Sequence, residues 1–241
     1  MFRVVIPARW QSTRFPGKPL ALIDGRPMIA HVCTRAAESG AAGVIVATDD
    51  ERIAVAAHAA GAEVCMTAAS HASGTDRIAE VAKLRGFAAD DIVVNLQGDE
   101  PRMPAAIVRQ VATALAAQRS AAIATAASPL RSQAEYLDPN VVKVVTDPAG
   151  RALYFSRAPI PWDRDGAGTD RAFAGARRHI GLYAYRAAAL LRFAALAPTP
   201  LELLEKLEQL RALEHGMEIH VVEAAGIPGP DVNTPEDLQR T

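Results

Sequence analysis

The chain has little cysteine, almost no net charge and no long apolar run. Its two cysteines, Cys33 and Cys65, lie in apolar segments with no other metal ligands nearby, so we expect buried, reduced thiols rather than a disulfide or a zinc site. A formal net charge of −1 argues against nucleic acid as the main partner, because that partner requires a basic face. No segment is long and apolar enough to span a membrane, and the first residues lack the features of a secretory signal. We therefore expect a cytoplasmic protein with no membrane partner.

Half of the 241 residues are hydrophobic, which suits one large α/β domain or such a domain with an insertion. In the first half, short β-prone runs alternate with Ala-rich helical stretches, as is typical of βαβ units around a parallel sheet. Gly40 and Gly61 are helix stops in this pattern. The expected strands are 2–6, 43–47, 63–66, 91–96 and 121–126, and the expected helices are 27–39, 50–60, 75–85 and 104–118.

The second half has a different character. An Asp-Pro-Ala-Gly turn at 147–150 between two β-prone runs predicts a hairpin over 141–156. The Pro-, Gly- and Asp-rich stretch 158–176 is expected to be mobile. A strand over 179–185, a helix over 200–215 and a last strand over 218–222 follow.

A basic loop follows the first strand. Arg9, Arg14 and Lys18 lie in it, among small residues. Because ligands of open α/β sheets bind beyond the carboxyl ends of the strands, and guanidinium and ammonium groups bind phosphate, this loop predicts a polyphosphate site. Its spacing is not that of a Walker sequence. The alternative is a solvated basic surface loop.

Asp99 follows another buried run, in Gln97-Gly98-Asp99-Glu100-Pro101. A carboxylate at a strand end, opposite a triphosphate, suits Mg²⁺; the alternative is a cap for the next helix. If the last strand lies beside this one, an oxygen of Asp231 or Asn233 would be a second metal ligand. The turn around Ser73 and Gly74 could present backbone groups to a base or ribose, although a plain helix cap explains it equally well.

A second substrate would be bound by residues of the second half. A sugar acid needs a cation for its carboxylate and hydrogen-bonding groups for its hydroxyls. Each candidate alone could be an ordinary surface or capping residue, and only their grouping favours a site. The candidates are Arg157, His179, Tyr183, Glu208 and Gln209.

Several of these segments resemble one enzyme family. The blocks are Ile-Pro-Ala-Arg-x-x-Ser-Thr-Arg-x-Pro-Gly-Lys-Pro-Leu, Val-Ala-Thr-Asp, His-x-Ser-Gly-Thr-Asp-Arg, Gln-Gly-Asp-Glu-Pro, Tyr-Phe-Ser-Arg-Ala-x-Ile-Pro-Trp-Asp-Arg-Asp, Leu-Glu-Gln-Leu-Arg and Thr-Pro-Glu-Asp-Leu. The first is shared widely by sugar nucleotidyltransferases, whereas the Tyr154 to Asp165 block and the Leu-Glu-Gln-Leu-Arg block are narrower. Over nearly its whole length the chain resembles the 3-deoxy-manno-octulosonate (Kdo) cytidylyltransferases of bacterial lipopolysaccharide biosynthesis.

The resemblance implies a Rossmann-like nucleotidyltransferase fold, a three-layer α/β/α arrangement with a mixed sheet. It implies a nucleotide-binding half (1–128), an inserted sugar-acid-binding and dimerisation region (129–217) and a return segment (218–241). CTP and Kdo are the implied substrates, Mg²⁺ the cofactor and a homodimer the assembly. Implied catalytic residues are Arg14, Lys18 and Asp99; nucleotide-binding residues are Ala8, Arg9, Arg14, Lys18, Ser73 and Gly74; Kdo-binding residues are Gln97, Arg157, His179, Tyr183, Glu208 and Gln209; metal ligands are Asp99 and Asn233.

One departure from the family pattern concerns the metal. The family has an aspartate where this chain has Asn233, so one negative charge is lost there, and Asp231 could compensate. Two alternatives remain. Another sugar acid, such as sialate or an amino analogue of Kdo, could be the substrate, or the chain could be a nucleotide-binding regulatory protein without turnover.

Overall fold

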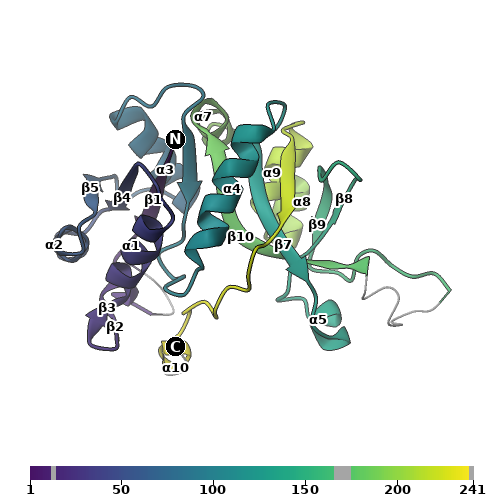
Figure 1. Ribbon diagram of the computed structural model, residues 1–241, viewed down its shortest axis with the longest axis horizontal. Helices are drawn as coiled ribbons and strands as arrows, with labels where there is room; N and C mark the ends of the chain where they lie inside the picture. Colours follow the sequence, from purple (N-terminus) through teal and green to yellow (C-terminus); the bar gives the residue numbers. More distant parts are fainter. Residues whose placement is uncertain (12–14, 166–174, 239–241) are drawn as a thin grey trace.

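The computed structural model describes residues 1–11, 15–165 and 175–238. Within this part a nine-stranded sheet has the order β11-β7-β10-β6-β1-β4-β5, and β8 and β9 continue from β10 (Figure 1). The strands are β1 (Phe2–Ala8), β2 (Leu22–Ile23), β3 (Arg26–Pro27), β4 (Gly43–Thr48), β5 (Glu63–Met66), β6 (Ile92–Asn95), β7 (Ile123–Pro129), β8 (Lys143–Thr146), β9 (Ala152–Ser156), β10 (Arg177–Arg186) and β11 (Ile219–Glu223). The helices are η1 (Lys18–Leu20), α1 (Met28–Glu38), α2 (Glu51–Ala59), α3 (Gly74–Leu84), α4 (Ala105–Ala117), α5 (Gln133–Leu137), α7 (Ala187–Ala194), α8 (Pro200–Glu205), α9 (Gln209–Glu214) and α10 (Pro235–Leu238).

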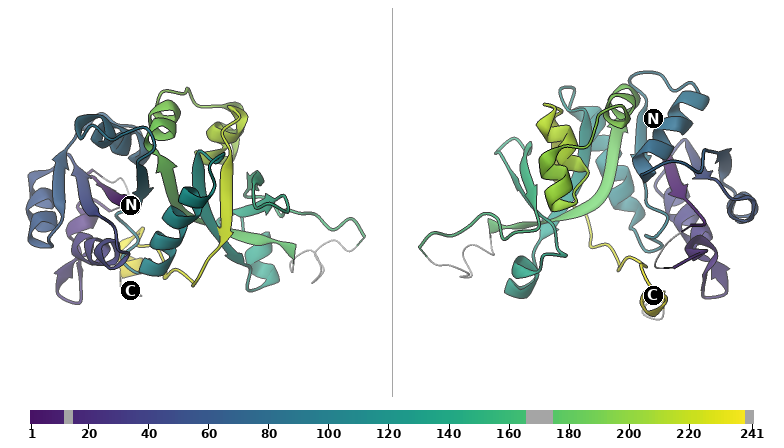
Figure 2. Two further views of the ribbon diagram at one scale, coloured as in Figure 1. Left: turned by 45° about the horizontal axis from the view of Figure 1, so that its top comes forward. Right: turned by 180° about the vertical axis from the view of Figure 1, so that it is seen from behind.

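Helices cover both faces of the sheet (Figure 2). Successive residues of a strand point to opposite faces. Accordingly, Val4 and Ile6 pack into the core formed with α1, α2 and α4, whereas Val5 between them packs into the core formed with α3, α7 and α9. The strand is therefore apolar throughout because it is buried on both sides. The predicted α/β/α layers and mixed sheet are confirmed.

The direction of the strands determines where the site lies. β1 pairs in parallel with both β4 and β6, so the chain leaves β1 and β6 at the same edge of the sheet. Gly98 allows the two exits to approach, because a Cβ atom there would lie 2.9 Å from the carbonyl oxygen of Pro7. The basic loop and Asp99 thus meet at one sheet edge, as their positions in the sequence predict.

An antiparallel strand separates the two parts of the parallel sheet. β10 pairs antiparallel with β6 on one side and with β7 on the other. The predicted hairpin is present as β8 and β9, and β8 pairs antiparallel with the first residues of β10. The region 129–217 thus contributes β10 to the middle of the main sheet.

Lys143 fixes the base of this hairpin. Its side chain is fully buried, and Nζ donates to the carbonyl oxygens of Asp138 (2.9 Å), Val141 (2.6 Å) and Arg157 (2.7 Å). Burial lowers the pKa of Lys143. Three acceptors match the three hydrogens of an ammonium group, so the charge is fully hydrogen-bonded inside the protein.

Some predicted elements were wrong. The single helix expected over 200–215 is two short helices, because Lys206 adopts a left-handed conformation (φ 55°) that ends α8. The helices α5 and α7 were not predicted, since both are short and follow strands closely. Of the stretch expected to be mobile, residues 166–174 lie outside the described residues.

Cys33 and Cys65 are buried and unpaired, which confirms the expected thiols. Burial raises the pKa of Cys33 to about 12. None of the helices that the structure describes is both long and apolar enough to cross a bilayer.

Candidate active site

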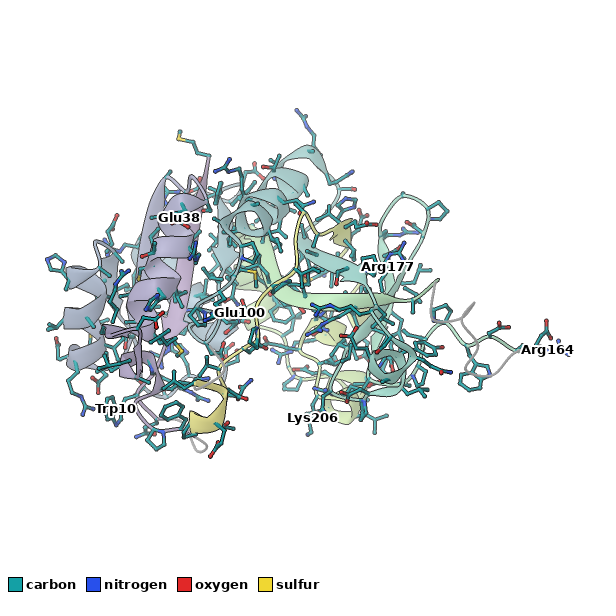
Figure 3. All side chains as sticks on the ribbon, turned by 60° about the horizontal axis from the view of Figure 1, so that its bottom comes forward. Trp10, Glu38, Glu100, Arg164, Arg177 and Lys206 are labelled. Atoms are coloured by element: carbon teal, nitrogen blue, oxygen red, sulfur yellow. The ribbon has the colours of Figure 1, made fainter. Side chains whose placement is uncertain are left out.

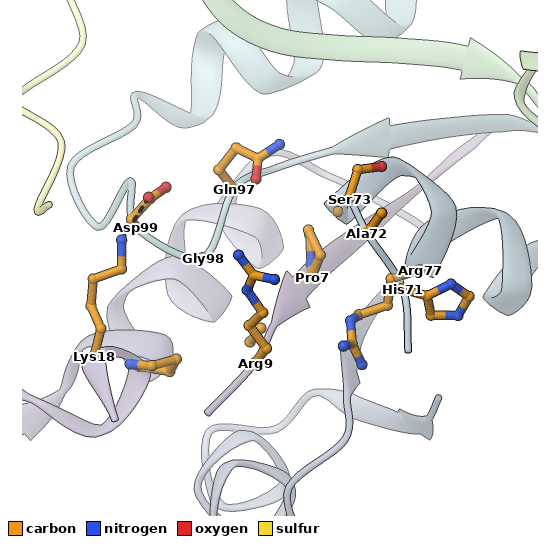
Figure 4. Close-up of a pocket in the computed structure, with 13 residues that line it drawn as sticks. Pro7, Arg9, Lys18, His71, Ala72, Ser73, Arg77, Gln97, Gly98 and Asp99 are labelled. Atoms are coloured by element: carbon orange, nitrogen blue, oxygen red, sulfur yellow. Dashed lines mark hydrogen bonds and ion pairs between the residues drawn. The ribbon is translucent and has the colours of Figure 1, made fainter. Parts of the chain in front are cut away.

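A cavity of about 240 Å³ opens at the carboxyl ends of β1 and β6, and we call it the β1–β6 cavity. Arg9, Gln97 and Ser73 surround its centre, and Lys18 and Asp99 close one side (Figure 4). The lining residues are Pro7, Ala8, Arg9, Lys18, Pro19, His71, Ala72, Ser73, Gly74, Arg77, Gln97, Gly98 and Asp99.

Trp10 and Gly17 join the two ends of the basic loop. The backbone N–H of Gly17, at φ 70°, donates to the carbonyl oxygen of Trp10 at 3.0 Å. A Cβ atom at Gly17 would lie 2.7 Å from the Trp10 ring, so glycine is required by both the conformation and the space. The Arg52 guanidinium lies 3.3 Å from the centre of the same ring. Ser12, Thr13 and Arg14, between these ends, lie outside the described residues.

Lys18 connects the basic loop to Asp99 and to the C-terminal segment. Its Nζ donates to Oδ2 of Asp99 at 2.8 Å and to the carbonyl oxygen of Val232 at 3.0 Å. The backbone N–H of Val232 in turn donates to the carbonyl oxygen of Asp99 at 3.0 Å. These three contacts place Asp231 and Asn233, on either side of Val232, next to Asp99.

Carboxylates gather around this point. Burial, then the charges of Asp231 and Asp99, raise the pKa of Glu100 well above its usual value. Burial and the charge of Asp99 also raise the pKa of Asp231. Oε2 of Glu100 is buried and has no hydrogen-bond partner among the described residues. Figure 3 shows Glu100 near the middle of the molecule.

These oxygens fit a magnesium ion. The described residues contain no cluster of three or more His, Cys, Asp and Glu side chains arranged to hold a metal by themselves. Mg²⁺ commonly takes only one or two carboxylates and completes its coordination with phosphate oxygens and water. The unpartnered oxygen of Glu100 and the mutual repulsion of these acids are what a nearby divalent cation would offset.

The start of α3 forms the opposite wall. The hydroxyl of Ser73 accepts from the Asp76 N–H, and the Asp76 carboxylate accepts from the Ser73 N–H, both at 3.2 Å. Ser73 is therefore a helix cap, and it lines the cavity as well. The buried Thr75 hydroxyl donates to Oε2 of Glu208 at 2.8 Å. Burial raises the pKa of Glu208, whose Oε1 has no partner among the described residues.

A second cavity, of about 280 Å³, borders β10, and we call it the β10 cavity. The two cavities share the loop after β6, because Asp99 lines the β1–β6 cavity and Glu100 lines the β10 cavity. Its lining residues are Glu100, Asn140, Val141, Val142, Arg178, His179, Ile180, Gly181, Tyr183, Leu207, Gln209, Pro228, Gly229 and Asp231.

A bulge in β10 shapes this cavity. The register against β7 shifts between Ile180 and Tyr183, and the His179 and Tyr183 rings lie 5.4 Å apart. Nε2 of His179 lies 3.0 Å from the Thr125 hydroxyl. Burial lowers the pKa of His179 to about 3, so its ring is neutral near pH 7.

The structure separates the sequence-predicted residues into three groups. The β1–β6 cavity brings together Ala8, Arg9, Lys18, Ser73, Gly74, Gln97 and Asp99. The β10 cavity brings together His179, Tyr183, Gln209 and Asp231. Arg157, Glu208 and Asn233 line neither cavity.

Arg157 instead contacts backbone. Its Nε donates to the carbonyl oxygen of Glu205 at 2.7 Å, and Nη1 donates to that of Pro139 at 2.9 Å. Four ionisable lining residues were not among the predicted ones: His71, Arg77, Glu100 and Arg178. The first three lie in the sequence motifs quoted above, from which they could have been predicted. Arg178 lies in none of these motifs, and its position in the cavity depends on the course of β10.

Comparisons with known proteins agree with this geometry. A family model described as "Cytidylyltransferase" matches residues 3–219. A 3-deoxy-manno-octulosonate cytidylyltransferase of Alkalilimnicola ehrlichii is 59% identical over 98% of this chain and 93% of its own length. A solved CMP:2-keto-3-deoxy-manno-octonic acid synthetase complexed with CTP is similar with a TM-score of 0.90 and 41% identity, covering 100% of this chain and 96% of that one. A cytidylyltransferase structure from Leptospira borgpetersenii, at 17% identity and TM-score 0.60 over 97% and 82% of the chains, shares the fold.

Proposed function

The chain belongs to the cytidylyltransferase family, and from this membership we propose that it transfers the cytidylyl group of CTP to Kdo. The products are CMP-Kdo, used for lipopolysaccharide biosynthesis, and pyrophosphate. The observation that carries this proposal is the pair of cavities on the two sides of Asp99 and Glu100. One has cations beside a helix start, as a nucleoside triphosphate requires, and the other has several side chains that can form hydrogen bonds to a sugar.

The chemical step is an in-line displacement at phosphorus. The oxygen of the anomeric C2 hydroxyl of Kdo forms a bond to the α-phosphorus of CTP, its proton is released to solvent, and the bond to pyrophosphate breaks. Arg9, Arg14 and Lys18 bind the phosphates, with Ala8, Ser73 and Gly74 around the nucleoside. Lys18 exchanges its contact with Asp99 for phosphate oxygens, which releases the Asp99 carboxylate.

The metal would be held by Asp99, with Asp231 or Asn233 as its second protein ligand. When bound, Mg²⁺ supplies charge that polarises the α-phosphate and lowers the pKa of the attacking hydroxyl. Asp231 lines the β10 cavity and follows β11, so it is placed to make good the charge lost at Asn233.

Kdo occupies the β10 cavity in this proposal. His179, Tyr183 and Gln209 line it and would bind hydroxyls of the sugar. Gln97 faces the first cavity and would lie where the two substrates meet. Glu208 and Arg157 line neither cavity, and they would act by holding the elements next to the β10 cavity in place.

We also propose a homodimer formed through the second half. The strand β9 and the helix α8 are joined by a hydrogen bond of 2.6 Å from the Ser156 hydroxyl to Oε1 of Glu205. Both carry exposed leucines, and such an apolar patch supports a dimer interface there. The leucines are Leu153, Leu201, Leu203 and Leu204. The molar mass in light scattering tests it: twice the 25.5 kDa of the chain is expected, and Leu204→Glu should reduce it. A cytoplasmic location also stays a prediction, since CTP is supplied there.

The decisive experiment is turnover of the purified protein with CTP and Kdo. We expect pyrophosphate and CMP-Kdo in equal amounts with Mg²⁺ and none with EDTA. Sialate and the amino analogue of Kdo, offered in competition, distinguish the alternative substrates. CTP binding without pyrophosphate release from any sugar acid would favour the regulatory alternative.

A further inference from the structure

We propose that Arg178 binds the carboxylate of the sugar acid and thereby selects acids over neutral sugars. This inference rests on the proposed function. It gives the carboxylate to Arg178 and not to Arg157, the arginine among the Kdo-binding residues that the family resemblance implies.

Arg178 is the cationic side chain in the lining of the β10 cavity. The other charged lining residues among those described are Glu100 and Asp231, and both are acids. His179, the remaining basic side chain, is neutral near pH 7. An anionic substrate in this cavity therefore depends on Arg178 for attraction, because none of the other described lining residues is positively charged near pH 7.

The guanidinium is available for a ligand. Its ion pair among the described residues is with Glu135, at an Nη1–Oε1 distance of 3.5 Å. Charge-assisted hydrogen bonds are about 2.7–2.9 Å long, so this contact is loose. The side chain is 43% exposed and lines the cavity, so a ligand that enters the cavity can reach it.

Arg157 is engaged elsewhere. Two of its nitrogen atoms donate to the carbonyl oxygens of Glu205 and Pro139, and it lies outside the cavity lining. Together with Lys143, which binds the carbonyl oxygens of Asp138 and Val141, it holds the 138–141 turn. Val141 lines the β10 cavity. Arg157 is thus a positioning residue for one wall.

The neighbouring residue supplies a matched control. Arg177 and Arg178 are consecutive on β10, so their side chains point to opposite faces of the strand. Arg177, labelled in Figure 3, does not line the cavity. Arg177→Gln removes the same charge from the same strand without removing the proposed carboxylate contact.

The test measures kcat and KM with CTP and two acceptors, Kdo and its C1 carboxamide. Wild-type protein is expected to use the carboxamide poorly. Arg178→Gln should raise KM for Kdo on the order of tenfold to a hundredfold, as loss of a hydrogen bond to a charged group does, with KM for CTP within about twofold. It should also reduce the preference for Kdo over the carboxamide. The uncharged carboxamide makes no ion pair with Arg178, so the substitution removes an ionic contact from Kdo alone.

Arg178→Lys should restore part of the preference, since the charge is kept while the paired geometry is lost. Arg177→Gln should behave as wild type. Arg157→Gln should raise KM for both acceptors and leave their ratio unchanged. A ratio preserved in Arg178→Gln, or abolished in Arg157→Gln, would overturn the assignment to Arg178.

The two proposals fail in different ways. Absence of any Kdo turnover by the wild-type protein refutes the proposed function. Normal Kdo turnover with an unchanged carboxamide ratio in Arg178→Gln refutes the role of Arg178 alone. The melting temperature of each variant shows whether it is folded. If Arg178→Gln does not fold, the preference of Arg178→Lys for Kdo over the carboxamide tests the assignment instead.

Discussion

The two cavities share one loop, yet they are built in different ways. The β1–β6 cavity lies where parallel strands end, and short contiguous segments supply its walls. The β10 cavity lies beside an antiparallel strand, and its walls come from segments spread between residues 100 and 231. In the proposed function, the ends of the parallel strands present backbone groups and cations toward phosphate, and the inserted strand presents the side chains that distinguish one acceptor from another.

Asp99→Asn tests the loop that both cavities share. We expect kcat to fall about a hundredfold or more with the fold intact, because an electrostatic group at the reacting phosphate is lost. Pyrophosphate release measures it. Asp90→Asn, at a side chain that is 93% exposed, is the control. Near-normal turnover of Asp99→Asn would remove this residue from the metal site.

Lys143→Met should affect the β10 cavity more than the β1–β6 cavity. Removing the buried ammonium leaves three carbonyl oxygens without their donor, so we expect a loss of about 2–3 kcal/mol in the free energy of unfolding. KM for Kdo should rise more than KM for CTP, since the 138–141 turn borders the β10 cavity alone. Urea unfolding and steady-state kinetics measure the two effects. The exposed Lys83→Met is the control, and equal rises in both KM values would contradict this difference.

Gly98→Ala should act mainly on the other cavity. The added methyl group meets the carbonyl oxygen of Pro7 at 2.9 Å, so β1 and β6 must move apart at their ends. We expect a loss of about 1–2 kcal/mol in stability and a higher KM for CTP. Gly226→Ala is the matched control, because its nearest neighbour atom would be 3.9 Å away. An unchanged KM for CTP would show that this close approach does not shape the nucleotide site.

The last prediction concerns His179 and applies only below neutral pH. Its pKa is lowered to about 3 in the folded protein, so below pH 6.5 the unfolded chain binds a proton that the folded protein does not. Stability should therefore fall as the pH decreases from about 6.5 toward 3, by less than about 1.4 kcal/mol per pH unit from this residue. Urea unfolding across that range should show a shallower decrease for His179→Gln, and the exposed His58→Gln should leave the slope unchanged.

The sequence predicted the first cavity well, and the reason is local. Arg9 directly follows β1, Lys18 lies further along the same loop, and Asp99 lies in the loop after β6, so the parallel arrangement brings these loops together without further information. The second cavity depends on features that no short segment reveals. The left-handed Lys206 splits an expected helix and places Gln209 at the start of α9, and the bulge in β10 orients His179 and Tyr183. The engagement of Arg157 with backbone oxygens was equally invisible, because Pro139 and Glu205 are distant in sequence.

The course of the C-terminal segment has a practical consequence for handling the protein. From β11 it runs past Gly229 and Asp231, in the wall of one cavity, to Val232, which is fastened to Lys18 beside the other, and on to α10 (Figure 1). Met1, by contrast, precedes the end of β1 that lies away from both cavities. An affinity tag for purification or immobilisation therefore belongs before Met1, and a fusion after Thr241 would pull on the segment that lines the β10 cavity and is bonded to Lys18.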